Sequence, residues 1–405
     1  MRFFKYVVDP TKCVKCGFCE TIVKCPSPER CIGCEACYLA CPYYARIPVE
    51  DKSERRYIKI KVDGVEYEVP EYITVKKALE ILGYVFTRYP EPGKMFAPCN
   101  TGGCYACAVL VDGELKPACH TPVREGMEIC TNVEGITPLR IVEGFSPHPV
   151  GGVGTPYWLK YEGKYIEVAA FAAGCNLRCP TCQNYHVTYN SSLSPLTPEE
   201  AARILTSYRR RYGVHRMAIS GGEPTINRRW LVQFFKELRK LNRDEKARFH
   251  LDTNATILTK DYIDELIEDT GITDIGPDIK ALKLETFQLI TNITDKELAE
   301  KYLKTEWEAV RYIADNYYPD KVFMGIGIPY NREFHPTFDE IYKMGLEIAK
   351  IDPDIQVCVL DYRGEFRKWN MPRPTVDDML MVKEVLENAG LKKVIVQTSI
   401  GHIGP

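Results

Sequence analysis

Three cysteines at positions 175, 179 and 182 have the spacing in this chain that most directly suggests catalysis. The run Cys175-Asn-Leu-Arg-Cys179-Pro-Thr-Cys182 supplies three thiolates, whereas a cubane iron-sulfur cluster has four irons and usually takes four. Three ligands leave one iron open, and an open position distinguishes a catalytic metal site from a closed structural one. We expect a 4Fe-4S cluster here that binds a substrate or cofactor, with a zinc site as the alternative.

Eight more cysteines form two runs near the N-terminus. They are Cys13, Cys16, Cys19 and Cys25, followed by Cys31, Cys34, Cys37 and Cys41, and each run ends in Cys-Pro. The second run has the C-x2-C-x2-C-x3-C-P spacing of bacterial two-cluster ferredoxins, and the first has two extra residues before its last cysteine. Residues 6–45 therefore resemble that family, and a domain is expected over 1–50. Two structural zinc sites are the alternative.

The ferredoxin resemblance implies that the fourth cysteine of each run binds the cluster of the other run. One 4Fe-4S cluster would be held by Cys13, Cys16, Cys19 and Cys41, and the other by Cys31, Cys34, Cys37 and Cys25. Both clusters would then have complete thiolate sets. We expect them to transfer electrons and not to bind substrate.

A third cysteine set, Cys99, Cys104, Cys107 and Cys119, has the plant-type C-x4-C-x2-C spacing with a distant fourth ligand. A hairpin at Asp63-Gly64, between strands 57–62 and 65–69, and a helix from Thr74 to about Leu82 are predicted before it. Residues 57–140 thus resemble a β-grasp 2Fe-2S ferredoxin domain, with a zinc knuckle as the alternative. Gly102 and Gly103 suit a loop that needs positive φ and backbone N–H groups aimed at sulfide.

The remainder of the chain predicts an α/β fold. From about residue 157, apolar runs alternate with amphipathic segments. The expected strands are 165–172, 216–220, 248–253, 272–279, 322–328, 355–360 and 393–398, and the expected helices are 198–212, 228–241, 260–269, 282–291, 298–317, 337–350 and 375–389. This alternation implies a parallel sheet, closed or partly closed. The Gly/Pro-rich segment 146–156 is expected to be a joint between domains, and the tail 397–405 either covers the barrel mouth or is a simple tail.

The run Cys175–Cys182 follows the first of these strands, and Ser220-Gly-Gly-Glu-Pro-Thr225 follows the second. In a β/α barrel the active-site loops lie at such strand ends. Together the two segments resemble the radical S-adenosylmethionine (SAM) superfamily. The resemblance implies a partial (β/α)6-type TIM barrel over 157–405, SAM as cofactor, Cys175, Cys179 and Cys182 as catalytic cluster ligands, and contacts from Gly221, Gly222 and Glu223 to the methionine amino group.

Two further segments, Asp252-Thr-Asn254 and Asp278-Ile-Lys280, resemble motifs of glycyl-radical-enzyme activating enzymes such as the pyruvate formate-lyase activating enzyme. The resemblance implies that Asp252, Asn254, Asp278 and Lys280 contact the ribose and methionine parts of SAM. An exposed ion pair is the alternative for 278–280. Gly325-Ile-Gly-Ile328 either flanks adenine or forms a glycine-rich buried strand, and Tyr362-Arg-Gly364 is either a substrate loop or a solvated one. Thr181 stands where the superfamily usually has an aromatic residue.

These patterns predict reductive cleavage of SAM to a 5′-deoxyadenosyl radical, with three 4Fe-4S clusters and one 2Fe-2S cluster. An external low-potential donor would supply electrons through the fused ferredoxin domains. The hydrogen donor is expected to be a glycine of a partner protein, and a small molecule, lipid, RNA or peptide is the alternative. A non-catalytic electron-transfer subunit is the third hypothesis.

Composition narrows the class of protein and its location. The 405 residues carry 53 Lys and Arg against 55 Asp and Glu, a formal charge of −2, which gives no reason to expect nucleic acid as a partner. Residues 1–10 lack the features of a secretory signal, and no apolar stretch approaches the ~20 residues that span a bilayer. A cytoplasmic protein without a membrane partner is expected, and in that reducing compartment clustered cysteines favour metal sites over disulfides. Cys130 and Cys358 lie outside the spacings and are expected to be buried.

Overall fold

A computed structural model describes residues 2–159 and 164–405, so Met1 and residues 160–163 of the predicted domains lie outside the described residues. The chain divides into two compact units. The first contains 1–143, 172–176 and 184–197, and the second contains 144–171, 177–183 and 198–405. The domain limits predicted from sequence, 1–50, 57–140 and 157–405, stay a prediction. Among the described residues, no helix combines the length and apolar character needed to traverse a bilayer.

In the N-terminal part of the first unit, two strands pair to form a small sheet, and the chain between them forms two short helices. Strand β1 (Phe4–Val8) pairs antiparallel with β2 (Arg46–Glu50). Between them, α1 (Phe18–Thr21) and α2 (Ala36–Ala40) each follow a residue with left-handed backbone, Gly17 at φ 75° and Glu35 at φ 57°. The same turn therefore begins both helices, and the two cysteine runs fold alike.

The rest of the first unit is built on a five-stranded sheet in the order β4-β3-β9-β7-β8. Its elements are β3 (Tyr57–Val62), β4 (Val65–Pro70), α3 (Val75–Ile81), β7 (Ala108–Val111), β8 (Glu114–Pro117), η1 (Ala118–His120) and β9 (Met127–Cys130), with β5 (Phe86–Thr87) and β6 (Met95–Phe96) as a separate pair and α4 (Tyr185–Thr188) contributed from farther along the chain. Alternate residues of β3 are buried in one core with α3, so the period-2 pattern decides which face is apolar. The predicted hairpin at Asp63-Gly64 and the helix capped by Thr74 are confirmed.

A nine-stranded sheet, whose strands follow one another in sequence order from β10 to β18, is the centre of the second unit. The strands are β10 (Val142–His148), β11 (Glu167–Ala172), β12 (Arg216–Gly221), β13 (Arg248–Thr253), β14 (Asp274–Pro277), β15 (Phe323–Tyr330), β16 (Gln356–Asp361), β17 (Val394–Thr398) and β18 (Gly401–Ile403). Pairing from β12 to β17 is parallel. The sheet and its helices form the predicted α/β partial barrel.

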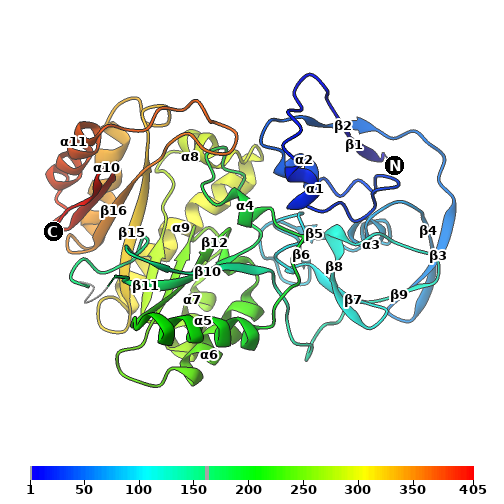
Figure 1. Ribbon diagram of the computed structural model, residues 1–405, viewed down its shortest axis with the longest axis horizontal. Coiled ribbons are helices and arrows are strands. Elements are labelled where there is room, and N and C mark those ends of the chain that lie inside the picture. The colour runs from blue at the N-terminus through cyan, green and yellow to red at the C-terminus, as the bar shows by residue number, and fades with distance from the viewer. Residues whose placement is uncertain (1, 160–163) are drawn as a thin grey trace. The chain divides into compact units, whose positions relative to one another are not determined.

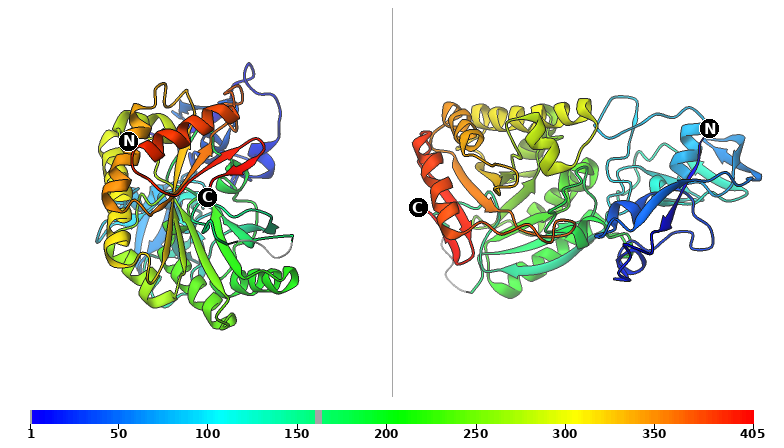
Figure 2. Two further views of the ribbon diagram at one scale, coloured as in Figure 1. Left: turned by 90° about the vertical axis from the view of Figure 1, so that its left-hand side faces the viewer. Right: turned by 90° about the horizontal axis from the view of Figure 1, so that it is seen from above.

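Helices cover the outer side of this curved sheet (Figures 1 and 2). They are α5 (Pro198–Tyr212), η2 (Pro224–Ile226), α6 (Arg228–Leu241), α7 (Lys260–Thr270), α8 (Leu284–Thr291), α9 (Lys296–Asn316), α10 (Asp339–Ile351) and α11 (Val376–Asn388). All seven predicted strands and all seven predicted helices are confirmed, with shifts of a few residues at their ends. Strand β10, which includes part of the predicted joint, and strand β18 in the C-terminal tail were not predicted.

The Gly/Pro-rich segment 146–156, which was predicted to be a joint between domains, packs against strands of the barrel. A Cβ on Gly276 would lie 2.3 Å from the Val153 carbonyl oxygen, and a Cβ on Gly327 would lie 2.8 Å from Val153 Cγ2. Gln356 holds the same segment, because its Nε2 donates to the Thr155 carbonyl at 2.7 Å. The glycines of β14 and β15 thus make room for the segment, which favours the buried-strand interpretation of 325–328.

Charged side chains are buried where β11 and β12 begin. Arg216 Nε lies 3.0 Å from Glu167 Oε2, and both side chains are almost completely buried. His148 Nδ1 and His250 Nδ1 lie 3.5 and 3.9 Å from the same carboxylate. Burial would raise the pKa of Glu167, but Arg216 and the two histidines outweigh it and hold this pKa below its usual value.

Replacing Glu167 by Gln is expected to lower the free energy of unfolding by about 3–5 kcal/mol, because Arg216 stays buried without its counter-charge. Chemical denaturation at pH 7 measures this. The folded pKa is depressed, so the contribution of the pair is present above the unfolded value of about 4.3 and is lost as pH falls below it. The exposed pair of Glu268 with Lys321 gives the control, since Glu268→Gln should cost less than about 1 kcal/mol. Equal losses in the two variants would contradict the prediction.

Candidate active site

Three of the predicted SAM-binding segments lie along one edge of the barrel sheet in the second unit. Strands β12, β13 and β14 are parallel neighbours, with Ile219 beside Leu251 and Thr253 beside Pro277. The residues that directly follow each strand therefore emerge at the same edge. This edge brings together Gly222 and Glu223 after β12, Asn254 after β13, and Asp278 and Lys280 after β14. Gly221 is the last residue of β12, and Asp252 is the residue before the last of β13.

Glu223 joins the end of β12 to the end of β13. It is 1% exposed, and its Oε1 accepts hydrogen bonds from Thr225 N at 3.0 Å, Thr225 Oγ1 at 2.7 Å and Thr253 Oγ1 at 2.7 Å. Its Oε2 accepts from Asn254 N at 2.6 Å. Burial raises the pKa of this carboxyl, and the four donors oppose that effect. Glu223 therefore fixes the shape of both loops.

Thr225 and Thr253 are site residues that the motif analysis did not single out. Their hydroxyls donate to Glu223, and Thr225 also lies in the short η2 turn, which begins at Pro224 and is capped by the Glu223 side chain. The available signal was local: a Thr two residues after a Glu can close such a side-chain turn. The contact from Thr253 has no local signal, because it crosses from one strand to the next.

Asp252 and Asn254 have different surroundings although they are two residues apart. Asn254 is buried, and its Oδ1 accepts from Thr256 N at 3.1 Å and Thr256 Oγ1 at 2.7 Å. Asp252 Oδ1 lies 3.0 Å from His250 Nε2, and a Cβ on Gly152 would lie 2.8 Å from Asp252 Oδ2. Asn254 thus shapes its own turn, whereas Asp252 faces the Gly-rich segment.

Lys280 is buried and pairs with the partly buried Asp278, which differs from the exposed ion pair given as the alternative for these residues. The Lys280 side chain is 6% exposed, and its Nζ contacts an Asp278 carboxylate oxygen and lies 3.0 Å from Tyr362 Oη. Its backbone N donates to Glu306 Oε1 at 3.2 Å. Burial would lower the pKa of Lys280, but Asp278 and Tyr362 raise it well above the usual value. The ammonium is therefore a fixed positive charge.

The second unit also contains two of the three cysteines of the Cys175–Cys182 run. Burial raises the pKa of the Cys179 thiol to about 12, and Lys280 acts against this shift by favouring the thiolate. The loop is held by its backbone, since Arg178 N donates to the Thr291 carbonyl and Arg367 N to the Pro180 carbonyl, both at 2.9 Å. Thr181 is buried, so an aromatic ring at this position would need more space.

Tyr362, at the end of β16, belongs to this site and not to a solvated loop. Burial raises its pKa, and its hydroxyl contacts Lys280. Its carbonyl accepts from Asn331 Nδ2 at 2.8 Å, which ties β16 to the loop after β15. From the sequence, residues 362–364 could be predicted only as a loop at the end of a barrel strand. No local pattern indicates the contact with Lys280, which is 82 residues away.

In the first unit, the predicted 2Fe-2S ligands form one buried group. Cys99, Cys104, Cys107 and Cys119 are each at most 3% exposed, and Cys99 Sγ and Cys104 Sγ are 3.0 Å apart. Thr101 N and Ala106 N donate to these two sulfurs at 3.4 and 3.5 Å. Gly102 has φ 90°, as expected, whereas Gly103 is required for close packing, with the Asn190 carbonyl oxygen 2.4 Å from where its Cβ would lie. Buried thiolates that accept backbone N–H groups fit a 2Fe-2S cluster.

N–H groups also donate hydrogen bonds to the sulfurs of three N-terminal cysteines. Tyr6 N donates to Cys31 Sγ at 3.4 Å, and Ala45 N donates to Cys41 Sγ at 3.2 Å. Arg46 Nη2 donates to Cys19 Sγ at 3.1 Å. These sulfurs therefore sit where negative charge is stabilised, which suits cluster ligands. The expectation that Cys130 is buried is wrong, because it is half-buried at a strand end, whereas Cys358 is buried as predicted.

Three protein families match successive parts of the chain. Residues 170–341 match the radical SAM superfamily, residues 55–134 match a 2Fe-2S iron-sulfur cluster binding domain, and residues 25–47 match a 4Fe-4S binding domain. These segments contain, respectively, the Cys175–Cys182 run, the Cys99–Cys119 set and the second N-terminal run.

Similar curated proteins include the probable GTP 3′,8-cyclase of Methanococcus aeolicus, 29% identical over 136 residues, which are 33% of this chain and 43% of that protein. The GTP 3′,8-cyclase of Brucella abortus is 26% identical over 210 residues, 50% of this chain and 60% of that protein. An uncharacterized iron-sulfur protein of Methanocaldococcus jannaschii is 44% identical over 63 residues, 16% of this chain and 12% of that protein. The chain thus spans less than two thirds of each relative.

Among solved structures, HydG, a maturase of the FeFe hydrogenase, aligns with a TM-score of 0.42 at 17% identity, over 56% of this chain and 50% of that one. Native anSMEcpe with bound AdoMet aligns with a TM-score of 0.35 at 15% identity, over 53% and 57%. The family matches agree with the cysteine spacings and with the α/β fold. Residues 170–341 are therefore a radical SAM domain, which is joined in one chain to 2Fe-2S and 4Fe-4S ferredoxin domains.

Proposed function

We propose that this chain is a radical SAM enzyme that cleaves SAM reductively and uses the product radical to abstract hydrogen. When bound, a 4Fe-4S cluster and SAM supply one electron and, by S–C5′ cleavage, a 5′-deoxyadenosyl radical. Cys175, Cys179 and Cys182 would hold the cluster. The observation that carries the proposal is geometric: the parallel strands β12, β13 and β14 end side by side, so the predicted SAM-binding segments that follow them emerge at one edge of the barrel sheet.

The chain's own residues supply complementary charges for the two ends of a methionine. SAM presents an ammonium and a carboxylate, and the strand edge contains a buried carboxylate, Glu223, and a buried ammonium, Lys280. We assign the amino group to the Gly221–Glu223 loop, where glycines permit close approach. Asp252, Asn254, Asp278 and Lys280 would contact the ribose and methionine parts. Because Glu223 already accepts four hydrogen bonds, its main contribution is to hold the two loops in position.

For the hydrogen donor, we propose a glycine of a partner protein, on the resemblance of Asp252-Thr-Asn and Asp278-Ile-Lys to activating enzymes. The second candidate is a small molecule. It is favoured by the relatives named GTP 3′,8-cyclase, which match up to half of this chain. The N-terminal ferredoxin domains would pass electrons inward from an external low-potential donor in either case.

The test is anaerobic reconstitution with iron and sulfide, followed by an assay for 5′-deoxyadenosine with dithionite as reductant. The proposed reaction class predicts SAM-dependent formation of 5′-deoxyadenosine, and an electron-transfer subunit predicts none. Deuterated candidate substrates then identify the hydrogen donor, because the label appears in 5′-deoxyadenosine. A glycyl radical signal in a partner protein would support the first candidate, and label transfer from a nucleotide would replace it with the second.

A further inference from the structure

In the first unit, the predicted 2Fe-2S loop touches the backbone that leads directly to Cys175. A Cβ on Gly174 would lie 2.5 Å from Cys104 Cβ and 3.2 Å from Cys104 N. The position before Cys175 that contacts Cys104 can therefore be occupied only by glycine. Gly174 also has φ 83°, a conformation that favours glycine. A predicted ligand of one cluster thus packs on the residue next to a predicted ligand of another.

Backbone hydrogen bonds hold this contact in place. Ile141 N donates to the Gly103 carbonyl at 3.0 Å, and Ala173 N donates to the Ile141 carbonyl at 2.9 Å. Gly174 N donates to the Thr188 carbonyl at 3.0 Å. The cluster-binding loop and the Cys175 segment are therefore fixed to each other by main chain, which does not depend on side-chain rotamers.

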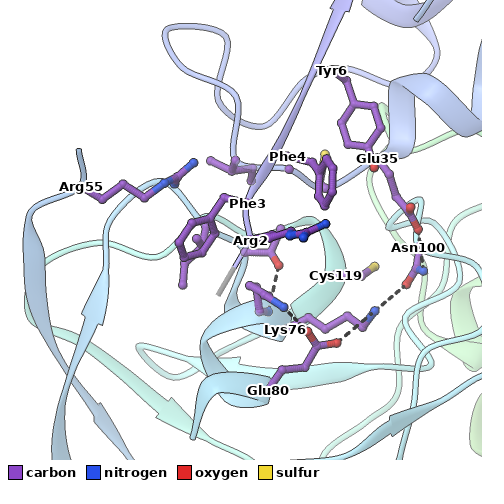
Figure 3. Close-up of a pocket in the computed structure, with 16 residues that line it drawn as sticks. Arg2, Phe3, Phe4, Tyr6, Glu35, Arg55, Lys76, Glu80, Asn100 and Cys119 are labelled. Carbon is purple, nitrogen blue, oxygen red and sulfur yellow. Dashed lines mark hydrogen bonds and ion pairs between the residues drawn. The ribbon is translucent and has the colours of Figure 1, made fainter. Parts of the chain in front are cut away.

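The same loop meets the N-terminal ferredoxin region on its other side. Asn100, next to Cys99, donates from Nδ2 to Oε1 of Glu35, next to Cys34, at 2.8 Å (Figure 3). Beside this bond, a cavity of about 250 Å³ is lined by Cys34 and Cys119 among other residues. The 2Fe-2S loop thus lies between the second N-terminal run and Cys175.

A competing connection leaves the first N-terminal run at Phe18, next to Cys19. The Phe18 ring contacts the rings of Tyr185 and His186 at centroid distances of 5.5 and 5.3 Å. These residues are three and four positions beyond Cys182. This path joins ring to ring and then needs a further stretch of chain, whereas Cys104 packs directly on the covalent neighbour of Cys175.

We propose that electrons reach the Cys175 site in a fixed order, from the second N-terminal run through Glu35 and Asn100 to the Cys99–Cys119 loop, and from Cys104 across Gly174 to Cys175. This inference rests on the proposed function. For each SAM cleaved, one electron leaves the centre held by Cys104, which is oxidised by one unit, and the centre held by Cys175 is reduced by one unit. The centre held by the second N-terminal run then reduces the centre held by Cys104, and an external one-electron reductant restores the N-terminal centre. No bond or proton changes at the contact itself.

The fixed order is tested first in the unmodified, fully loaded protein by EPR at partial reduction. Spin coupling depends steeply on distance, so the signal of the Cys175 site should be broadened when the 2Fe-2S centre is reduced. Broadening that follows only the reduction of the N-terminal 4Fe-4S centres would overturn the proposal in favour of the Phe18 path. The measurement needs no SAM cleavage, so it stays informative if the proposed function fails.

A variant pair tests the contact itself. Gly174→Ala and Gly113→Ala impose the same backbone conformation on an alanine, because both glycines have φ 83°, but a Cβ at Gly113 meets no described heavy atom within 4 Å. Gly174→Ala should slow reduction of the Cys175 site by a limiting low-potential donor roughly ten- to a hundredfold, the scale of loss that an ångström of misplacement produces. In Gly113→Ala, the Cys175 site should be reduced at the wild-type rate. Iron content and thermal unfolding show that both variants are loaded and folded.

Two further variants separate the routes if Gly174→Ala does not fold. Cys119→Ala should remove the 2Fe-2S signal and slow reduction of the Cys175 site to a similar extent. Phe18→Leu should leave that rate unchanged. Wild-type reduction in Cys119→Ala, or slow reduction in Phe18→Leu, would overturn the proposed order.

Discussion

Replacing Cys182 by Ala is expected to abolish formation of 5′-deoxyadenosine and to remove about four irons per chain, the content of one 4Fe-4S cluster. Two thiolates do not hold the cluster, and no SAM can then be cleaved. The fold should persist, because the hydrogen bond from Cys182 to the Cys179 carbonyl involves only backbone atoms, at 3.2 Å. Iron analysis, EPR and the 5′-deoxyadenosine assay measure the loss.

The matched control is Cys130→Ala, which deletes a thiol outside every predicted ligand set. Cys130 Sγ contacts the Asn132 carbonyl at 3.5 Å and the Asp63 side chain, and it belongs to no predicted cluster, so iron content and activity should stay at wild-type values. Full activity in Cys182→Ala would show that the run is not the catalytic site. An equal loss in Cys130→Ala would point instead to general failure of cluster assembly.

Replacing Lys280 by Met is expected to have the second-largest effect, on both SAM binding and stability. The variant leaves Asp278 and the Tyr362 hydroxyl without their cationic partner in a largely buried site. Breaking a buried pair in this way costs roughly 3–5 kcal/mol. SAM binding to the reconstituted protein should also fall below detection in equilibrium dialysis, because the methionine end loses its positive charge. Denaturation and dialysis give the two readouts separately.

Lys392→Met is the control, since Lys392 pairs with Asp354 at 2.9 Å on the exposed surface. It should cost less than about 1 kcal/mol and leave SAM binding unchanged. If Lys280→Met lost stability but bound SAM normally, Lys280 would be a structural residue only. If it lost neither, the fixed charge inferred from its surroundings would be wrong.

Local signals were sufficient to predict the main strands and helices of the barrel and their order. Apolar period and turn residues are properties of neighbouring positions, so the hairpin at Asp63-Gly64 and the alternating strands and helices after residue 157 could be found without tertiary information. Cysteine spacing is equally local, because a cluster takes its ligands from short loops. The packing of segment 146–156 could not be predicted for the same reason: its glycines and prolines indicate a break in regular structure, and they do not show that Val153 packs on Gly276 and Gly327.

The contacts of the site residues could not be predicted from the sequence, because the residues that make them are far apart along the chain. Glu223 was expected to meet the cofactor, yet it accepts hydrogen bonds from Thr225, from Thr253 at the end of β13 and from Asn254 directly after β13. Tyr362 reaches Lys280 from 82 residues away. Parallel pairing sets these contacts, and the register of one strand against the next is not written in either strand alone.

The sequence by itself predicted the chemistry of this protein's ligands: three thiolates at 175–182 that leave one iron open, and twelve more thiolates in complete sets. Only the tertiary structure decided which of these sets adjoin within the first unit, because the packing of Gly174 on Cys104 depends on backbone approach between segments seventy residues apart. It also decided that Lys280 is a buried charge and not a surface one, since Asp278 and the distant Tyr362 contact its ammonium. Spacing specifies what a residue can bind, and packing specifies which neighbours it acts with.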